Sequence, residues 1–449
     1  MTPPVTRRAF LSSTTAILAA ATMPGIGAAP APTSTSQSAR KLNIGVVGVA
    51  DRGWANIADL LKVPAANIVA LCDVDSNHLA TAAQKIPNAA TYADFREMLK
   101  HTDLDAVLVA TPDHTHAVST AAALRAGKHV YCEKPLAHSI SEIRTITQLA
   151  QETKLVTQMG IQIHALDTYR RVVELIRSGV IGPVKEVHIW HNRVHKHVPG
   201  ELTAPPANLN YDLWLGPVEA RPYHADYHPY NWRRHWAFGT GMLGDIGCHL
   251  MDVAFWALDL QHPTRIEAEG DPLDNDFVAE WMIARYDFPA RGDKPAVQLT
   301  WYDNPKRPPQ LADWKLPDKL AKEGVMFVGS EGMVYCNYGE YHLMPEEKFK
   351  ITNQIVEKIP SSPGHHAEWV AACLANDPAA VGAPFSYGSL LSETALLGTI
   401  AFRYGKPLDW DSATGQFPSS PEAEVFLRES TAKIGTCDRP SGSRNYSLE

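Results

Sequence analysis

The sequence predicts an α/β protein with a doubly wound parallel sheet in its N-terminal part. Its C-terminal part is predicted to be an α+β domain whose sheet is open and largely antiparallel. Two observations predict the parallel sheet: apolar runs of strand length alternate with helical segments, and a glycine-rich turn follows the first strand. A third predicts the antiparallel sheet, because short strands follow one another from Arg265 onward with few helical segments between them.

The first strand and the turn after it carry a dinucleotide-binding fingerprint. Residues 42–48 (LNIGVVG) form the apolar strand, and a helix is expected from Gly53 to about Lys62. The turn GVADRG matches the pattern G-x-G-x-x-G except at Ala50, where the second glycine lets the backbone approach the pyrophosphate. The turn residues expected to bind the cofactor are Gly48, Ala50, Asp51, Arg52 and Gly53.

An aspartate after the second strand indicates which cofactor is bound. The strand is expected at 68–72, and Asp73 follows it directly, where an acidic residue accepts a hydrogen bond from the adenosine ribose of NAD. A carboxylate repels the 2′-phosphate of NADP, so NAD is favoured. Arg52 leaves NADP open as the alternative.

Two further strands of this sheet end in polar loops. Strands are expected at 106–110 and 129–132, joined by a helix at 118–126 that Gly127 ends. The loops after them read TPDHTH and EKP. Both should face one crevice, because ligands bind outside the carboxyl ends of parallel strands. The loop residues expected at the cofactor are Thr111, Pro112, His114, His116, Glu133 and Lys134.

The remaining pattern divides the chain into domains. The dinucleotide-binding domain should span 41–163, with helices at 92–100 and 138–153 and a last strand at 155–159. The catalytic domain is expected at 164–417, with helices that return to the first domain, and a polar C-terminal arm at 418–449. The elements predicted in the catalytic domain are helices at 165–178, 244–258, 365–375 and 387–404, and strands at 184–192, 266–269, 278–286, 296–302, 325–329 and 332–336.

Two segments of the catalytic domain should shape a site. Residues 199–229 are rich in proline and turns and are predicted to form an insertion over the cleft. In the apolar helix at 244–258, Asp245, His249 and Asp252 stand at i, i+4 and i+7, on one face. Buried polar groups must meet partners or a ligand. The structural alternative is a core histidine that a carboxylate one turn away satisfies.

The first 40 residues predict export. Arg7-Arg8 precede a weakly apolar run at 16–21 and a small-residue site near Ala29, which is typical of a twin-arginine (Tat) signal peptide at 1–29. A linker would follow at 30–40. The prediction is a periplasmic protein whose precursor meets the Tat machinery; the alternative is a disordered basic N-terminus.

Composition argues against several classes of partner. The net charge of −8 argues against nucleic acid, and no apolar run approaches the roughly 20 residues of a membrane span. The six cysteines are scattered without CxxC spacing, and a disulfide stays open. The histidines between 188 and 249 lie mainly in turn-rich sequence without a carboxylate on one clear element, so no metal is predicted.

Five motifs together resemble the Gfo/Idh/MocA oxidoreductase family. They are GVVGVADRG, CDVD, ATPDHTH, AGKHVYCEKPLA and GTGMLGDIGCHLMD, and the similarity extends from about Lys41 to about Asp411. The resemblance implies an N-terminal Rossmann domain and a C-terminal α/β domain whose open antiparallel sheet faces the nicotinamide. It also implies oxidation of a secondary alcohol on a sugar or cyclitol. The Tat signal resembles the exported branch, which includes glucose-fructose oxidoreductase and glycoside-acting members.

The resemblance also assigns site residues. It implies Lys134, Asp245 and His249 as the catalytic set and adds Gln162 to the cofactor site. The residues expected at the substrate are His164, Asn192, Trp232, Arg233, Asp245 and His249. As a hypothesis, His249 accepts the hydroxyl proton while Asp245 fixes its tautomer. Lys134, with a pKa lowered by desolvation, would hydrogen-bond the same hydroxyl.

The export prediction bears on the reaction. A periplasmic enzyme meets no nicotinamide pool, so NAD should stay tightly bound and be regenerated within the cycle or pass its electrons on. One chemistry is sugar oxidoreduction; the alternative is redox-neutral glycoside hydrolysis through transient oxidation at C3. The family's α-N-acetylgalactosaminidase branch replaces the EKP lysine, so Lys134 favours the oxidoreductase. A sensor without catalysis would need no proton acceptor. Family members commonly pair through the open sheet face, which predicts a homodimer or homotetramer.

Overall fold

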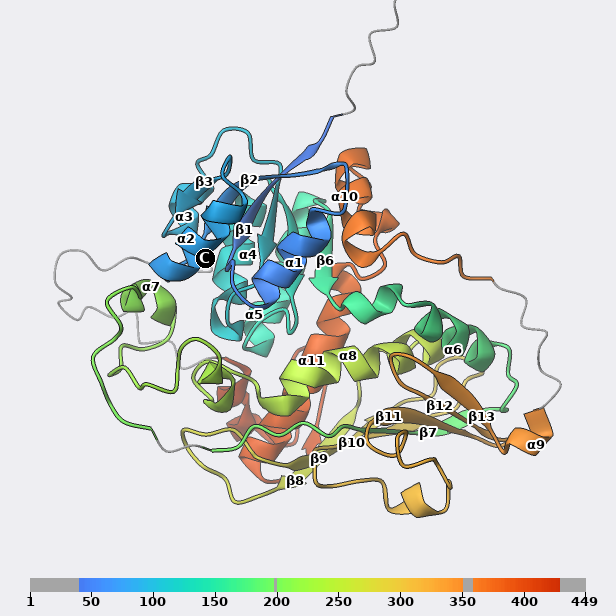
Figure 1. The fold of residues 1–449 in the computed structure, drawn as a ribbon. Helices are drawn as coiled ribbons and strands as arrows, with labels where there is room; N and C mark the ends of the chain where they lie inside the picture. The colour runs from blue at the N-terminus through green and yellow to red at the C-terminus, as the bar shows by residue number, and fades with distance from the viewer. Residues whose placement is uncertain (1–39, 198–199, 350–357, 429–449) are drawn as a thin grey trace, which may run out of the picture. The chain divides into compact units, whose positions relative to one another are not determined.

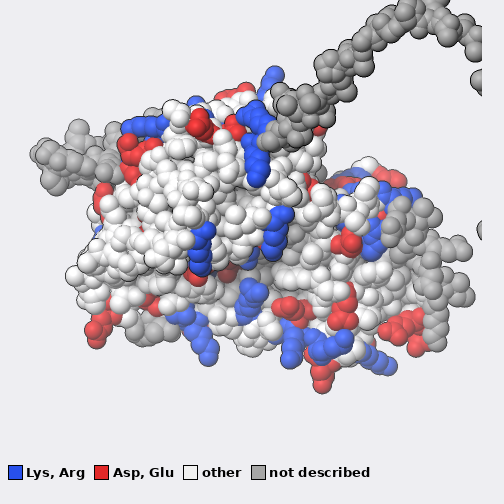
Figure 2. All heavy atoms as spheres, turned by 45° about the horizontal axis from the view of Figure 1, so that its top comes forward, with Lys and Arg blue, Asp and Glu red and all other residues white. Residues whose placement is uncertain are grey.

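A computed structural model describes residues 40–197, 200–349 and 358–428. The predicted signal peptide, the linker up to residue 39 and the arm beyond residue 428 lie outside the described residues. Within the part of the chain that is described, no helix combines the length and the apolar character that a membrane span requires. On the face drawn in Figure 2, basic and acidic side chains are interspersed.

The N-terminal sheet of the described chain has six parallel strands in the order β3-β2-β1-β4-β5-β6, the order of a doubly wound Rossmann sheet. This confirms the predicted fold class. The strands are β1 (Leu42–Val47), β2 (Ala66–Cys72), β3 (Ala90–Tyr92), β4 (Ala106–Val109), β5 (His129–Glu133) and β6 (Thr157–Gly160). The helices that accompany them are α1 (Arg52–Leu60), α2 (Ser76–Lys85), α3 (Phe95–Met98), α4 (His116–Arg125) and α5 (Ile140–Thr153).

One predicted helix of this domain is wrong. The segment 92–100 holds the end of strand β3 and the single turn of α3 instead of one long helix. Thr91 and Tyr92 pair with the last residues of β2, which suits β-branched and aromatic side chains at a sheet edge. Asp94 then caps α3 by accepting a hydrogen bond from the amide of Arg96, so the helix cannot begin earlier.

The C-terminal sheet has eight strands in the described residues, in the order β13-β12-β11-β7-β10-β9-β8-β14. All neighbours are antiparallel except β7 and β10, so the sheet is mixed and mostly antiparallel, as predicted. The strands are β7 (Val184–Trp190), β8 (Arg265–Gly270), β9 (Met282–Phe288), β10 (Val297–Tyr302), β11 (Gly324–Gly329), β12 (Met333–Cys336), β13 (Tyr341–Met344) and β14 (Leu408–Asp409). The other helices are α6 (Asp167–Arg177), α7 (Tyr211–Leu215), α8 (Gly241–Leu258), α9 (Glu346–Phe349), α10 (His365–Ala375) and α11 (Phe385–Tyr404).

One face of this sheet packs against α6, α8 and α11, and the helices return to the Rossmann domain (Figure 1). Val187, Leu299 and Phe327 point to this side and are fully buried. Helix α10 packs on α1 and β1, while α11 packs on α5 and β6. Helix α8 therefore lies between the second sheet and the Rossmann domain, which positions its polar stripe at the cleft.

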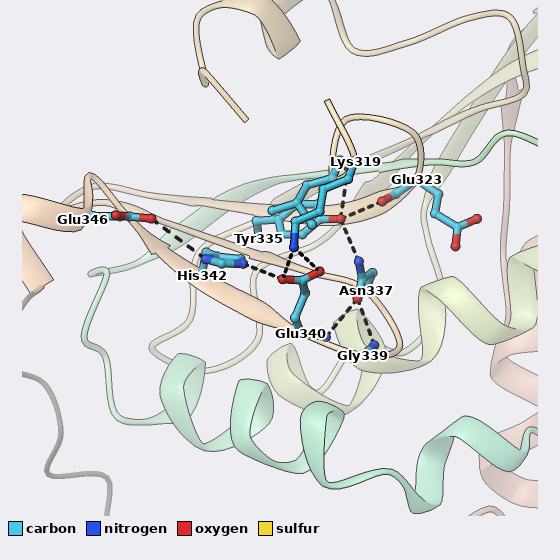
Figure 3. Close-up of polar contacts among 9 residues, drawn as sticks. Lys319, Glu323, Tyr335, Asn337, Gly339, Glu340, His342 and Glu346 are labelled. Atoms are coloured by element: carbon cyan, nitrogen blue, oxygen red, sulfur yellow. Dashed lines mark hydrogen bonds and ion pairs between the residues drawn. The ribbon is translucent and has the colours of Figure 1, made fainter. Parts of the chain in front are cut away.

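The other face of the sheet is covered in part by the segment 303–323. Trp314 and Leu320 of that segment pack on Trp190 and Tyr335 in a separate apolar cluster. The Tyr335 hydroxyl lies 2.8 Å from the Glu323 carbonyl oxygen and 3.1 Å from that of Leu320 (Figure 3). The face that the resemblance implied to be open is thus partly occupied by the chain itself.

Candidate active site

A cavity lies at the carboxyl ends of β1, β2, β3 and β4. Its other side is closed by the segment 200–238, called the insertion below, which extends past the predicted bounds of 199–229. The space between the cavity's walls amounts to about 910 Å³, part of it open to solvent. Residues from both sides that line it include Gly48, Arg52, Asp73, Thr111, Trp214 and Trp232. The carboxyl end of a parallel sheet is the expected place for a dinucleotide.

The turn after β1 fits a dinucleotide. Gly48 has φ +82°, and a Cβ there would lie 2.7 Å from the Ala110 carbonyl oxygen. A Cβ on Gly53 would lie 1.9 Å from the Gly48 oxygen, so the turn needs both glycines. Ala50, Asp51 and Arg52 line the cavity beside them. The second-glycine position therefore tolerates a methyl group without filling the cavity.

The acid after β2 also faces this cavity. Asp73 Oδ2 accepts a hydrogen bond from the Val49 amide at 3.0 Å, and Oδ1 accepts one from the Asp75 amide at 2.9 Å. Burial raises the pKa of Asp73, although these two amides oppose the shift. A carboxylate fixed at the end of β2 is suited to the ribose hydroxyls of NAD.

His114 and His116 are not among the side chains that line this cavity, and their predicted role at the cofactor stays a prediction. His116 places its ring nitrogens 2.7 Å from the Pro135 carbonyl and 2.8 Å from the Thr111 carbonyl. Two carbonyl acceptors require both nitrogens to carry a proton. Burial lowers the pKa of His116, but Cys132, Asp113 and the Pro135 carbonyl outweigh it and raise the pKa to about 9. His116 thus joins the two strand-end loops as a cation. His114 contacts a different group, the Trp214 carbonyl, at 2.8 Å.

Glu133 and Gln162 form a polar group beside the cofactor domain's last strands. Glu133 Oε1 accepts hydrogen bonds from Asn56 at 2.9 Å and from Gln162 at 2.7 Å. Its Oε2 is buried without a partner in the described residues. Gln162 also donates to the Tyr131 hydroxyl at 2.8 Å. Neither Glu133 nor Gln162 is among the residues that line the cavity, so their predicted place at the cofactor stays a prediction.

Lys134 and Asp245 meet where the two domains face each other. The ammonium of Lys134 donates to Asp245 Oδ1 at 2.7 Å and to the Asp245 carbonyl oxygen at 2.6 Å. Burial lowers the pKa of Lys134, but Asp245 and Asp113 outweigh it, and the net pKa is raised. The predicted lowering is therefore wrong, because the desolvated ammonium has an anionic partner.

Asp245 faces Lys134, Arg233 and His195 rather than His249. His195 Nε2 lies 3.5 Å from Oδ2, and Arg233 Nε lies 3.7 Å from Oδ1. Burial alone would raise the pKa of Asp245. Lys134, His195 and Arg233 outweigh burial and hold that pKa well below its usual range. Among the described residues no hydrogen bond joins Asp245 to His249. The carboxylate holds Lys134, which corrects the role expected for it as the group that fixes the histidine's tautomer.

His249 lies one turn further along α8. Its Nδ1 is buried and has no hydrogen-bond partner in the described part of the chain. Burial, with Lys134, Arg52 and Arg193 nearby, lowers the pKa of His249 well below its usual value. The imidazole is therefore neutral at pH 7 and can accept a proton. A core histidine satisfied by a neighbouring carboxylate is not what the structure shows.

His164 is buried and contacts protein side chains, and its predicted place at the substrate stays a prediction. Its Nδ1 lies 2.9 Å from Asp252 Oδ1, and its ring stacks on Trp256 at 4.0 Å between centroids. Tyr387 donates to the same Asp252 oxygen at 2.7 Å. The third residue of the polar stripe thus anchors α8 to α11 instead of binding a ligand.

The other predicted substrate residues differ in position. Arg233 stacks on Trp232 at 4.2 Å and on Tyr230 at 4.4 Å, and Arg233 and Trp232 line the cavity. Asn192 is exposed just beyond β7. Sequence reasoning missed His195 as a neighbour of Asp245. Its presence in the histidine-rich stretch was the one available signal.

One group of side chains in the described residues has the spacing of metal ligands: Asp75, His78 and His228, with ligand atoms within 4.8 Å of one another. Both oxygens of Asp75 already accept hydrogen bonds, from two amides of α2 and from the side chains of Asn208 and His228. The group is therefore satisfied by protein donors.

Comparison with known proteins agrees with this fold. Residues 42–161 match the model of the Gfo/Idh/MocA oxidoreductase family, NAD-binding Rossmann fold, and residues 176–294 match that family's C-terminal alpha/beta domain. Together the two models cover more than half of the chain. The fit of the turn, of Asp73 and of the cavity agrees with an NAD-binding domain.

Individual relatives match parts of the chain. Inositol 2-dehydrogenase 3 of Saccharopolyspora erythraea is 34% identical over 152 residues, 33% of this chain and 45% of that protein. A Glycosyl hydrolase family 109 protein of the same organism is 26% identical over 214 residues, 46% of this chain and 41% of that protein. The chain spans about half the length of the curated relatives it matches.

Among solved structures, an NAD-binding protein from Listeria innocua superposes with a TM-score of 0.59 at 16% identity. The match covers 82% of this chain and 97% of that one. At this identity the likeness shows the fold.

Proposed function

The chain belongs to the Gfo/Idh/MocA oxidoreductase family, and from this premise we propose that it oxidises a secondary hydroxyl of a sugar, glycoside or cyclitol with tightly bound NAD. One observation carries the proposal: the Lys134 ammonium, fixed by Asp245, and the neutral His249 stand on facing elements next to the dinucleotide cavity. Asp245 lies 3.7 Å from Arg233, which is part of the cavity wall. NADP stays the alternative cofactor.

His249 and Lys134 have different roles in the proposed alcohol oxidation. Such a reaction removes a hydride from carbon and a proton from the hydroxyl, and bound NAD supplies the hydride acceptor. His249, neutral at pH 7, accepts the hydroxyl proton. Lys134 stays cationic through Asp245 and donates a hydrogen bond to the substrate oxygen, where negative charge develops as the proton leaves.

Asp245 acts through Lys134 in this scheme. Without the carboxylate, a buried ammonium would lose its proton more readily, because burial alone lowers its pKa. Asp113 adds a second negative charge, and its Oδ2 accepts a hydrogen bond from Thr240 at 2.8 Å. That bond joins the loop after β4 to the start of α8. It therefore helps to hold α8, which carries His249, against the domain that carries Lys134.

A second candidate is redox-neutral cleavage of a glycoside, which the similarity to a Glycosyl hydrolase family 109 protein favours. In this reaction, transient oxidation at C3 acidifies the C2 proton, and elimination expels the aglycone. Water then adds across the double bond, and the hydride returns to C3. The same proton acceptor serves both reactions. Lys134, which the family's α-N-acetylgalactosaminidase branch replaces, favours the oxidation.

We also propose export by the Tat route, a periplasmic location and a homo-oligomer. Arg7-Arg8 and the small residues before Ala29 support the export. Fractionation of cells that express the full chain tests it, with an Arg7→Lys, Arg8→Lys variant as the control. Retention of the wild type in the cytoplasm would contradict it. Light scattering of the purified protein tests the oligomer.

The reaction is tested with protein purified without added cofactor. Free sugars, cyclitols and aryl glycosides are added in turn while the reduced-nicotinamide absorbance band and aglycone release are followed together. Growth of the band without cleavage supports the oxidoreductase. Aglycone release without a lasting change in the band supports the glycosidase. A protein that contains no nicotinamide and binds none when it is added would contradict both.

A further inference from the structure

The insertion forms one wall of the dinucleotide cavity. Leu213, Trp214, His228 and Trp232 line it opposite the strand ends of the Rossmann sheet. An aromatic cluster holds the insertion together: Trp214 stacks on Tyr227, and Phe238 packs edge-on against Trp214. The wall is therefore an ordered structure with a core of its own.

Asp75 ties this wall to the Rossmann domain. Its Oδ2 accepts hydrogen bonds from Asn208 at 2.8 Å and from His228 at 2.9 Å. Its Oδ1 caps helix α2 by accepting from the amides of Asn77 and His78. The residue is 3% exposed. Because Asp75 follows Asp73 by two positions, the tie lies directly beside the acid expected at the adenosine ribose.

The backbone strengthens the tie. The Ser76 amide donates to the Asn208 carbonyl at 2.9 Å, and the Asn210 amide donates to the Val74 carbonyl at 2.9 Å. These bonds flank an antiparallel bridge between Asp75 and Leu209. In Figure 1 the segment that carries α7 lies beside α2. The insertion is thus attached just beyond the end of β2 by a single β-bridge and two backbone hydrogen bonds.

A second attachment closes the wall further along the cavity. The ring of His114, after β4, contacts the Trp214 carbonyl at 2.8 Å and packs against Phe238 at 5.0 Å. The insertion is therefore fastened at the ends of both β2 and β4. A ligand in the cavity between these strand ends is therefore covered by a segment that is attached at two points, Asp75 and His114.

We propose that the insertion, fastened at Asp75 by Asn208 and His228, retains the bound dinucleotide between turnovers. This rests on the tightly bound cofactor of the proposed function and assigns the residues responsible. For the adenosine half to leave, the wall must move away from the end of β2, which breaks these hydrogen bonds. They are charge-assisted, because hydrogen bonds from Asn208 and His228 lower the pKa of Asp75 against its burial and keep it ionised.

The test compares two isosteric variants. Asn208→Asp puts a second carboxylate against Asp75 and removes the amide donor. Asn231→Asp makes the same change inside the insertion, where the Asn231 amide donates to Asp226 at 2.7 Å without crossing to the Rossmann domain. Each purified protein is loaded with NAD and desalted, and the nucleotide that remains per chain is measured over time. No sugar is present.

We expect Asn208→Asp to release NAD at least ten-fold faster than wild type, and Asn231→Asp to stay within about two-fold. Circular dichroism and the melting temperature check that both variants fold. Should Asn208→Asp fail to fold, His228→Gln replaces it, because it shortens the donor to the same Asp75 oxygen. Release from the folded variant at the wild-type rate, or equally fast release from both variants, would overturn the proposal.

Failure of this proposal and failure of the proposed function are distinguishable. Slow release from the wild type with no reaction on any sugar leaves the retention intact and contradicts the oxidoreductase. If a sugar reduces the bound NAD but Asn208→Asp leaves the rate of NAD release unchanged, the oxidoreductase is supported and the retention proposal is contradicted.

Discussion

The side chain of Lys134 reaches from the end of β5 to the first turns of α8, where it donates to both the carboxylate and the backbone carbonyl of Asp245. This contact joins the NAD-binding domain to the catalytic helix through residues 111 positions apart. Replacing Lys134 by alanine should therefore remove a hydrogen-bond donor to the substrate oxygen. We expect turnover to fall by about 10²- to 10⁴-fold with the NAD content unchanged.

The control for this prediction is Lys62→Ala, because Lys62 is an exposed lysine paired with Asp59 on α1. Steady-state kinetics with the best substrate measure the effect. Turnover of Lys134→Ala within a few-fold of the wild type would exclude the role assigned to this lysine.

Removing the carboxylate should change the pH profile on its alkaline side. Burial lowers the pKa of Lys134, and Asp245 is the main group that raises it. In Asp245→Asn the ammonium therefore loses its proton at lower pH, and the alkaline limb of kcat/KM should move acidward by at least about one unit. Asp245 also raises the pKa of His249, so the acid limb should not move to higher pH. An alkaline limb at the wild-type position would contradict the pairing.

A substitution in the turn after β1 should weaken the binding of NAD. In Gly53→Ala the added Cβ would lie 1.9 Å from the Gly48 oxygen, so the backbone that faces the pyrophosphate must shift. We expect NAD affinity at least about ten-fold weaker and a loss of about 1 to 3 kcal/mol in the free energy of unfolding. Gly339→Ala is the control, because its Cβ would meet only Asn337 at 3.8 Å. Calorimetric titration with NAD and urea denaturation give both quantities.

The sequence predicts five of the six Rossmann strands and most helices of the catalytic domain because these depend on local patterns. It does not predict β3, which has only three residues. The turn glycines, the acid after β2 and the EKP lysine follow fixed spacing along the chain. The structure places Gly48 and Asp73 in the cavity lining and Lys134 against Asp245. Helix α10 matches its predicted bounds because its apolar periodicity lies within one short segment.

What sequence reasoning could not give is the choice of partner for each polar side chain. His164 and Asp252 are 88 positions apart, and His114 and the Trp214 carbonyl are 100 apart. Spacing along the chain carries no information on such contacts. The sequence predicts the polar stripe on α8, but its residues have different partners in the structure. Asp245 faces Lys134, and Asp252 faces His164.

Two adjacent buried histidines predict how stability responds to acid. Burial lowers the pKa of His365 to about 3 and that of His366 to about 4, while an unfolded histidine titrates near its ordinary value of 6.5. Below pH 6.5 the unfolded chain therefore binds protons that the folded chain does not. The free energy of unfolding should fall by up to about 1.4 kcal/mol per pH unit for each residue as the pH drops towards about 4. His116, with a pKa of about 9, stays protonated in the folded state, so it opposes this slope near pH 6.5 and adds none below about pH 5.5.

His365→Gln isolates one of these contributions. Glutamine retains an N–H donor for the Met159 carbonyl, which His365 Nε2 contacts at 2.9 Å, but it does not titrate. Between pH 7 and pH 5 this variant should lose about 1 to 2 kcal/mol less stability than the wild type. Guanidinium denaturation of cofactor-matched samples at the two pH values measures the difference. The carboxylates titrate alike in both proteins and cancel. Equal losses in the two proteins would mean that His365 is already protonated in the folded state, because only a neutral folded imidazole produces this slope.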